Sequence, residues 1–131
     1  MADYFAIDGR RLSYSVMGAG PILVCINGFA ATALDWDPMF LEHLATSNRV
    51  VLIDYRGMGE SADDGKSFSI ADLAADVADV IRDIAIDGDA AVLGWSMGGF
   101  VAQELAIAHP GLVRRLILLS TDAGGDDSDY A

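Results

Sequence analysis

Short, nearly continuous runs of apolar residues recur along this chain, with polar residues or glycine on either side. Four of them are Ile22–Ile26, Arg49–Ile53, residues 90–93 and residues 115–119, two of which begin with an arginine. Runs of this length are typical of strands that are buried on both faces of a parallel sheet. The pattern therefore predicts a buried strand at each of these positions.

Between these strands, apolar residues recur at the spacing of a helix surface. The longest such segment is 69–84, where Ser69 and Asp72 form a capping-box pattern at the start. Shorter helices are predicted over residues 37–44 and 100–109, with a proline in the first turn of one and directly after the other. The stripe of the long helix that is predicted to be buried consists of Leu73, Val77, Val80, Ile81 and Ile84.

Two further strands, over residues 4–7 and 12–17, are joined at Asp8-Gly9, a dipeptide typical of hairpin turns. After this hairpin, strands and helices alternate. This order predicts an α/β fold with a mainly parallel sheet of about six strands and helices on both faces. Without internal repeats or a linker, residues 1–131 are predicted to form a single domain. The acidic, glycine-containing end, residues 120–131, is expected to be a flexible tail.

Segment 94–99, Gly-Trp-Ser-Met-Gly-Gly, carries the clearest chemical signal in the chain. A serine at a sharp strand-to-helix turn has a strained backbone and an exposed hydroxyl. It needs small residues two positions before and after it, here Gly94 and Gly98. The helix that follows would direct free N–H groups and its positive dipole end toward the serine. Ser96 is therefore predicted to be a nucleophile that stabilises a negatively charged tetrahedral intermediate.

The composition is that of a globular protein, and it limits the classes of partner. Of 131 residues, 53% are hydrophobic, and 20 acidic against 8 basic residues give a net charge of −12. This charge argues against nucleic acid and against an anionic membrane surface, and solubility is its ordinary explanation. The single cysteine, Cys25, lies in a predicted strand and is expected to pack in the core.

The sequence contains neither a signal-peptide pattern nor an apolar run long enough to span a membrane, which predicts a cytoplasmic location. A row of carboxylates lies on one side of the long predicted helix. This row is interpreted as a solvated surface rather than a metal site. No metal and no organic cofactor is expected. The carboxylates are those of Asp72, Asp76, Asp79 and Asp83.

Three separated motifs resemble the α/β-hydrolase superfamily. They are residues 27–29 (Asn-Gly-Phe), residues 54–61 (Asp-Tyr-Arg-Gly-Met-Gly-Glu-Ser) and segment 94–99, and their spacing fits the N-terminal half of that fold. The resemblance covers nearly all of this chain but about half of a typical member. It implies that residues 1–131 form a partial α/β-hydrolase core domain without the cap and the last strands.

The resemblance also implies roles for the matching residues. Ser96 would be the nucleophile, and the backbone N–H groups of Phe29 and Met97 would form the oxyanion hole. A serine at this position, where dehalogenases and epoxide hydrolases carry aspartate, implies transfer of an acyl group to water. The substrate would be a small molecule such as a carboxylic ester, a lactone or a related acyl compound.

Other residues of the three motifs are expected to shape the loops. Gly28 would allow its loop to approach the nucleophile, and Trp95 would either line a pocket or pack beside the sheet. Family members more often carry histidine at the position of Asn27, a change that would alter loop hydrogen bonds rather than the backbone donor. Asp54 and Arg56 are expected to fix their loop by hydrogen bonds or an ion pair.

A serine hydroxyl is a weak nucleophile unless a base accepts its proton. His109 lies at the far end of the helix that begins at Ser96, roughly 18 Å away at about 1.5 Å per residue, and His43 belongs to a different helix. In the family the acid and the histidine follow the nucleophile, and the histidine would fall beyond residue 131. Asp122 matches a position where a minority of relatives carry the acid, although a lone aspartate in a loop is more often structural.

Three interpretations are consistent with this pattern. The first is the N-terminal portion of a serine hydrolase, which carries the nucleophile and the oxyanion hole but lacks the histidine of the triad. The second is a non-catalytic binding or assembly module that retains the half-fold. The third is one chain of a split enzyme. In each case an exposed sheet edge would favour self-association or pairing with a complementing C-terminal chain.

Overall fold

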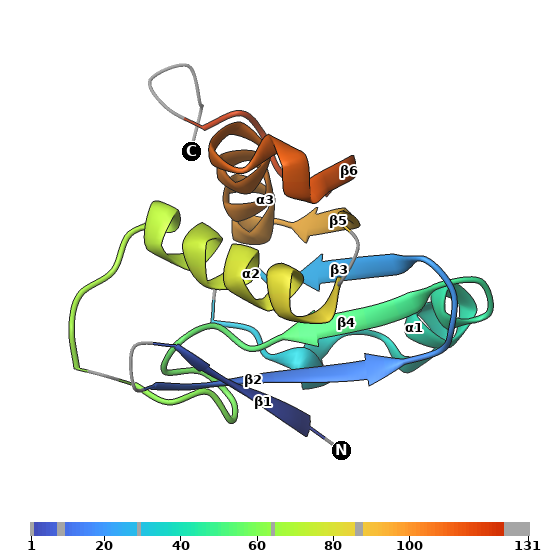
Figure 1. Ribbon diagram of the computed structural model, residues 1–131, viewed down its shortest axis with the longest axis horizontal. Coiled ribbons are helices and arrows are strands. Elements are labelled where there is room, and N and C mark those ends of the chain that lie inside the picture. Colours follow the sequence, from blue (N-terminus) through green and yellow to red (C-terminus); the bar gives the residue numbers. More distant parts are fainter. Residues whose placement is uncertain (1, 8–9, 29, 64, 86–87, 125–131) are drawn as a thin grey trace.

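The computed structural model describes residues 2–7, 10–28, 30–63, 65–85 and 88–124. The described residues form a six-stranded sheet with the strand order β1-β2-β4-β3-β5-β6 (Figure 1). The strands β4, β3, β5 and β6 are parallel to one another, and β1 and β2 are antiparallel at one edge. The strands are β1 (Ala2–Ile7), β2 (Arg10–Met17), β3 (Ile22–Ile26), β4 (Arg49–Ile53), β5 (Ala90–Trp95) and β6 (Val113–Leu119).

In the part of the chain that the structure describes, three α-helices cover the sheet, with α2 and α3 on one face and α1 on the other (Figure 1). Two short 3₁₀ turns, η1 and η2, precede α1 and β6. The predicted α/β architecture with helices on both faces is therefore confirmed. The helical elements are η1 (Ala33–Asp35), α1 (Pro38–Ala45), α2 (Ile70–Ile84), α3 (Met97–Ala108) and η2 (Pro110–Leu112).

Local sequence explains where α1 and α2 begin. Asp37 caps α1 by accepting a hydrogen bond from the backbone N–H of Met39, and Pro38 occupies the first helical position. Ser69 and Asp72 form the predicted capping box of α2. The hydrogen bonds from Ser69 stabilise the charged carboxylate of Asp72 and lower its pKa.

The side chains of the parallel strands point alternately into two hydrophobic clusters, one on each face of the sheet. Val24, Val51 and Val92 face α2 and α3, whereas Cys25 and Leu93 face α1. This alternation follows from the period of two residues in a strand. Burial of strand residues on both faces is the reason why continuous apolar runs identified these strands in the sequence.

Apart from β3 and β4, the predicted bounds differ from the observed ones by one to three residues at one or both ends. The helix predicted over residues 100–109 is α3, and it begins at Met97. Consecutive glycines have low helix propensity, but here the close approach of Gly98 to β3 determines the backbone, since a Cβ at Gly98 would overlap the carbonyl oxygen of Ile26. The strand predicted over residues 115–119 is β6, which begins at Val113.

The last part of the chain was predicted to be a loose tail from residue 120 onward. Residues 120–124 follow β6 without helix or strand. Residues 125–131 lie outside the described part of the chain. The hairpin is confirmed by the pairing of β1 with β2, in which Ile7 lies opposite Arg10, while the turn residues 8–9 are also outside the described part.

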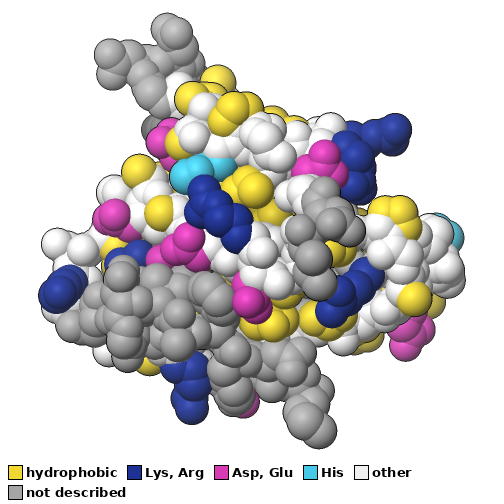
Figure 2. All heavy atoms as spheres, in the orientation of Figure 1, with side chains coloured by type: hydrophobic (Ala, Val, Ile, Leu, Met, Phe, Trp, Pro, Cys, Tyr) yellow, Lys and Arg dark blue, Asp and Glu magenta, His cyan; other side chains and the backbone are white. Residues whose placement is uncertain are grey.

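The charged groups on the α2 and α3 side are dispersed. Figure 2 shows acidic side chains scattered over this face among basic and apolar ones. Of the four aspartates predicted to form a solvated row on α2, Asp76 does not fit, because it is only 5% exposed and pairs with Arg56. None of the helices in the described part of the chain has both the length and the apolarity needed to cross a bilayer.

Candidate active site

Ser96 occupies the turn between β5 and α3. Its backbone angles are φ 56° and ψ −121°, in a region that residues with a side chain rarely adopt. The turn is fixed on both sides, because the N–H of Ser96 donates to the carbonyl of Leu119 (2.9 Å) and the N–H of Gly99 donates to the carbonyl of Ser96 (2.9 Å). The side chain of Ser96 is exposed. The strained, exposed serine predicted from the sequence is thus present at a strand-to-helix corner.

The glycines on either side of Ser96 are required by close contacts. A Cβ at Gly94 would overlap the carbonyl oxygen of Gly98, and a Cβ at Gly98 would overlap β3. Both positions must therefore lack a side chain if β5, α3 and β3 are to meet at this corner.

The N-terminus of α3 lies directly at Ser96. Met97 is the first residue of this helix of 12 residues, so its N–H has no partner four residues earlier within the helix. The helix dipole adds partial positive charge at the same end. The corner therefore combines an exposed hydroxyl with an amide donor that suits a developing oxyanion.

The loop after β3 approaches the same corner. A Cβ at Gly28 would be 3.4 Å from the Cβ of Ser96 and 3.5 Å from Cε3 of Trp95, which is ordinary van der Waals contact or slightly tighter. The N–H of Ala31 closes a turn by donating to the carbonyl of Gly28 (3.3 Å). Phe29, the predicted second oxyanion donor, lies outside the described residues. The structure thus brings together Ser96, Met97 and Gly28.

Asn27, at the end of β3, is completely buried and bonded through its side chain and its backbone. Its Nδ2 donates to the carbonyl of Ile53 (3.1 Å), and its Oδ1 accepts from the indole N–H of Trp36. The hydroxyl of Tyr55 donates to the carbonyl oxygen of Asn27 (2.6 Å), and burial raises the pKa of this tyrosine. Asn27 therefore joins the ends of β3 and β4 to the segment before α1.

Asp54 links the two loops that follow β3 and β4. Its Oδ1 accepts from the N–H of Ala33 (2.8 Å), and its Oδ2 accepts from the N–H of Glu60 (3.2 Å). Gly59, at φ 52°, packs so closely on this carboxylate that a Cβ would overlap it. The predicted role of Asp54 in fixing loop geometry is confirmed.

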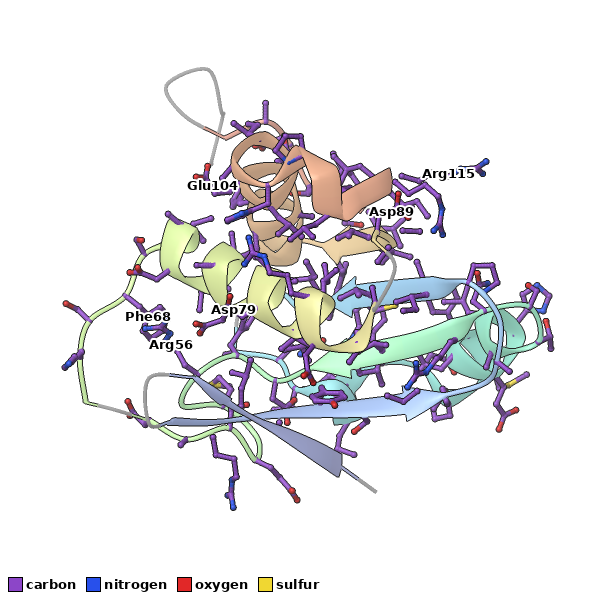
Figure 3. The ribbon with its side chains drawn as sticks, in the orientation of Figure 1. Arg56, Phe68, Asp79, Asp89, Glu104 and Arg115 are labelled. Carbon is purple, nitrogen blue, oxygen red and sulfur yellow. The ribbon has the colours of Figure 1, made fainter. Side chains whose placement is uncertain are left out.

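Arg56 anchors the second loop to α2. Its Nε and Nη2 donate to the two carboxylate oxygens of Asp76 at 2.9 Å and 2.8 Å, and the two side chains are 12% and 7% exposed. The guanidinium also lies 5.6 Å from the ring centroid of Phe68, beside it in Figure 3. The predicted ion pair of Arg56 is therefore present, with a partner that the sequence did not indicate.

Both histidines lie on parts of the fold away from the Ser96 turn, where neither could act as its general base. His109 caps the far end of α3, and its Nδ1 lies 3.2 Å from Nη2 of Arg82. His43 is exposed in the last turn of α1, the helix that leads to the start of β4, whereas Ser96 follows the carboxyl end of β5. Asp122 lies in the exposed loop after β6, where its Oδ1 accepts from the N–H of Gly124 (2.7 Å).

Trp36 is a residue of this region that the sequence motifs did not include. It is 7% exposed, and its ring lies 5.8 Å from that of Trp95, with the planes tilted by 60°. Of the two roles considered for Trp95, packing beside the sheet is the one for which the structure supplies a contact. A tryptophan ten residues after a strand has no motif of its own, so only the fold reveals its contact with the corner.

Among the described residues, no group of three or more histidine, cysteine, aspartate or glutamate side chains could hold a metal ion. Cys25 is fully buried, and burial raises its pKa to about 12. Its thiol is therefore protonated at neutral pH and not poised as a nucleophile.

Comparisons with known proteins agree with this geometry. A family model described as the alpha/beta hydrolase fold matches residues 21–130. The RutD protein of Azorhizobium caulinodans is 36% identical over 115 residues, which cover 88% of this chain and 43% of that protein. The pimeloyl-[acyl-carrier protein] methyl ester esterase of Aeromonas hydrophila is 33% identical over 111 residues, which cover 84% of this chain and 41% of the esterase.

Solved structures give the same result. The crystal structure of a hydrolase from Pseudomonas aeruginosa matches with a TM-score of 0.87 and 32% identity, over 96% of this chain and 48% of that protein. The chain thus spans less than half the length of each of these relatives. The family model, the sequence relatives and the arrangement of the Ser96 corner all lead to one assignment: the chain belongs to the α/β-hydrolase family.

Proposed function

We propose that this chain carries the nucleophile and the oxyanion hole of a serine hydrolase that acts on a carboxylic ester, a lactone or a related acyl compound. The observation that carries the proposal is the backbone of Ser96, held at φ 56° at the N-terminus of α3 and beside Gly28. A strained serine at a helix N-terminus is the arrangement that exposes the nucleophile in the α/β-hydrolase fold.

The first step is an attack by Oγ of Ser96 on the carbonyl carbon of the substrate. The Oγ–C bond forms while the hydroxyl proton passes to a base, and the π electrons of the carbonyl move to its oxygen. The N–H groups of Met97 and Phe29 stabilise this oxyanion, and each such donor typically contributes about 3 kcal/mol in the transition state. The carbonyl then re-forms as the bond to the leaving oxygen breaks, and that oxygen takes the proton from the base and departs as the alcohol. Water attacks the resulting ester of Ser96 in the same two steps and releases the acid.

The substrate class rests on the type of nucleophile and on the relatives. A serine attacks acyl carbon and leaves an ester that water can hydrolyse. One relative carries the name of a methyl ester esterase. Asp122 is the residue proposed as the triad acid on this chain. A cytoplasmic location and independence of metals and cofactors remain predictions from the sequence.

The histidine base would come from a polypeptide segment other than residues 1–131, and the exposed edge of β6 is the place where such a segment would pair. Residues 116–119 of this strand are 38–41% exposed although all four are leucine or isoleucine. Apolar side chains on both faces are typical of a strand inside a sheet rather than at its edge. The completing segment would be either a C-terminal continuation or a second chain.

The hydrolysis of p-nitrophenyl butyrate tests this function. The chain by itself is expected to have very low turnover, and fusion to the complementary C-terminal half of the Aeromonas hydrophila esterase is expected to raise it. Ser96→Ala should abolish the gain, whereas Ser47→Ala, at an exposed serine, should not. High turnover of the unfused chain that Ser96→Ala removes would show that an internal base exists.

The same apolar edge of β6 supports a second candidate function, that of an assembly module. In that case the partner would bind through β6 with no need for Ser96. Ser96→Ala would leave partner binding unchanged, and no fluorophosphonate would label Ser96 even after fusion to a completing half.

A further inference from the structure

Trp36 contacts both loops that form the Ser96 corner. It follows the η1 turn and is almost fully buried. Its indole N–H donates to Oδ1 of Asn27, the residue that begins the loop 27–31. Its ring packs against Trp95, the residue directly before Ser96. A single side chain thus joins the loop of one predicted oxyanion donor to the turn that holds the nucleophile.

We propose that Trp36 is a positioning residue, which holds the loop 27–31 and the Ser96 turn in fixed relation to each other. This inference rests on the proposed function, since it concerns the oxyanion hole of the same site. In this proposal the indole N–H of Trp36, and not only the volume of its ring, keeps the loop and the turn in place.

The hydrogen bond matters because the side chain of Asn27 has no access to water. Its Nδ2 donates to the carbonyls of Ile53 (3.1 Å) and Ala31 (3.5 Å), so the orientation of the amide determines where the end of the loop lies. Without the indole N–H, Oδ1 would be a buried acceptor that lacks this donor, and the amide would gain from rotating or moving toward water. Either movement would loosen Ala31 and with it the loop.

The contact between the rings of Trp36 and Trp95 also holds the turn of Ser96 in position. Cε3 of Trp95 is 3.5 Å from the position of a Cβ at Gly28, so Trp95 packs on the loop as well as on Trp36. A shift of Trp36 would therefore alter the position of Trp95 relative to Gly28. Because Ser96 is the next residue, the distance between its hydroxyl and the loop depends on this packing.

Amide hydrogen exchange of the native chain tests the proposal without any need for catalysis. Trp36→Phe keeps an aromatic ring but removes the N–H donor. We expect exchange to become about tenfold faster at residues 28 and 30–33 and also at residues 96–98, with no change in the middle of α2. Phe40→Leu is the matched control, because Phe40 stacks on Trp36 from outside at 6.3 Å and is 36% exposed. It should leave both segments unchanged.

A second variant keeps the test decisive if phenylalanine packs badly. β-(3-Benzothienyl)-alanine at position 36 has nearly the shape of tryptophan but no N–H, and it should reproduce the faster exchange. The double variant Asn27→Ala and Trp36→Phe should exchange no faster than Asn27→Ala alone, because both changes remove one interaction. Normal exchange with the benzothienyl side chain, or faster exchange in the loop without the Ser96 turn, would overturn the proposal.

The rate at which a small fluorophosphonate modifies Ser96 provides the functional measurement. The limiting rate should fall about tenfold in Trp36→Phe while the concentration for half-maximal rate stays the same, because the change affects the transition state rather than binding. Both rates are measured in the chain fused to a completing C-terminal half, and absence of labelling in the unsubstituted fusion would count against the proposed function. The exchange experiment would still decide the role of Trp36.

Discussion

The loops around Ser96 and the outer edge of β6 are built in opposite ways. In the loops, buried polar groups such as Asn27 and Asp54 are held by hydrogen bonds from several segments. Along β6, the leucines and the isoleucine of residues 116–119 remain about 40% exposed. The side of the corner that holds Ser96 is therefore organised by this chain itself. The edge strand β6, from which a segment with the base would approach, is exposed and apolar.

The largest effect is expected from a side chain within the close-packed corner. Gly98→Ala should destabilise the fold by about 3 kcal/mol, because its Cβ would overlap the carbonyl oxygen of Ile26. Gly111→Ala is the control, since a Cβ there has no atom within 4 Å. Urea denaturation measures both changes. Equal stability of the two variants would show that β3 and α3 do not meet as described.

The buried ion pair is the next test of the same region. Asp76→Ala should cost about 2 kcal/mol, because Arg56 would remain largely buried without its carboxylate. Asp79→Ala removes a pair with Arg82 in which both side chains are about half exposed (41% and 51%), and it should cost less than about 0.5 kcal/mol. Thermal unfolding should separate the two variants by several degrees. A similar loss in both would contradict the burial of Arg56.

The open edge of β6 should make the chain associate. Sedimentation velocity is expected to show dimers or larger species that grow with concentration, because the strand exposes both apolar side chains and an unpaired edge. Ile117→Lys should reduce this association. Ile107→Lys, at a 77% exposed position on α3, should not. A monomer at all concentrations would mean that the edge is protected in some other way.

The smallest effect is expected in the reactivity of the thiol of Cys25. Because burial raises its pKa to about 12, iodoacetamide at pH 8 should modify the native chain far more slowly than the unfolded chain. The raised pKa means that the folded state favours the protonated thiol. Its contribution to stability is therefore complete below about pH 9, the ordinary value, and decreases as the pH rises from 9 toward 12. Rapid modification of the native chain would contradict the burial of this strand.

Most of the fold could be predicted because the strands and the capped helices carry local signals. Ile22–Ile26 and Arg49–Ile53 occur with the predicted bounds, and α2 starts at the predicted capping box. The apolar pattern predicted that α3 begins at residue 100, whereas the turn pattern predicted a start at Ser96, and α3 begins at Met97. The two differ because Gly98 and Gly99 are poor helix formers, and their conformation depends on packing against distant segments. Local propensity does not contain that information.

The site was predictable only in part, for a similar reason. The pattern around Ser96 is contiguous and therefore visible in the sequence. The contacts that support it are not, since Trp36 reaches Asn27 and Trp95 across the fold, and Asp76 reaches Arg56 from another element. The aspartates of α2 look alike in the sequence. Only the position of the loop that carries Arg56 distinguishes Asp76 from its solvated neighbours.

Whether Ser96 is the nucleophile is tested by locating a fluorophosphonate adduct by mass spectrometry, in the chain fused to a completing C-terminal half. One phosphonyl group is expected on the peptide that contains Ser96. Ser96→Ala should lose it, and Ser47→Ala should retain it. A folded fusion protein that stays unlabelled, or a label on another residue, would contradict the assignment of Ser96 as the nucleophile.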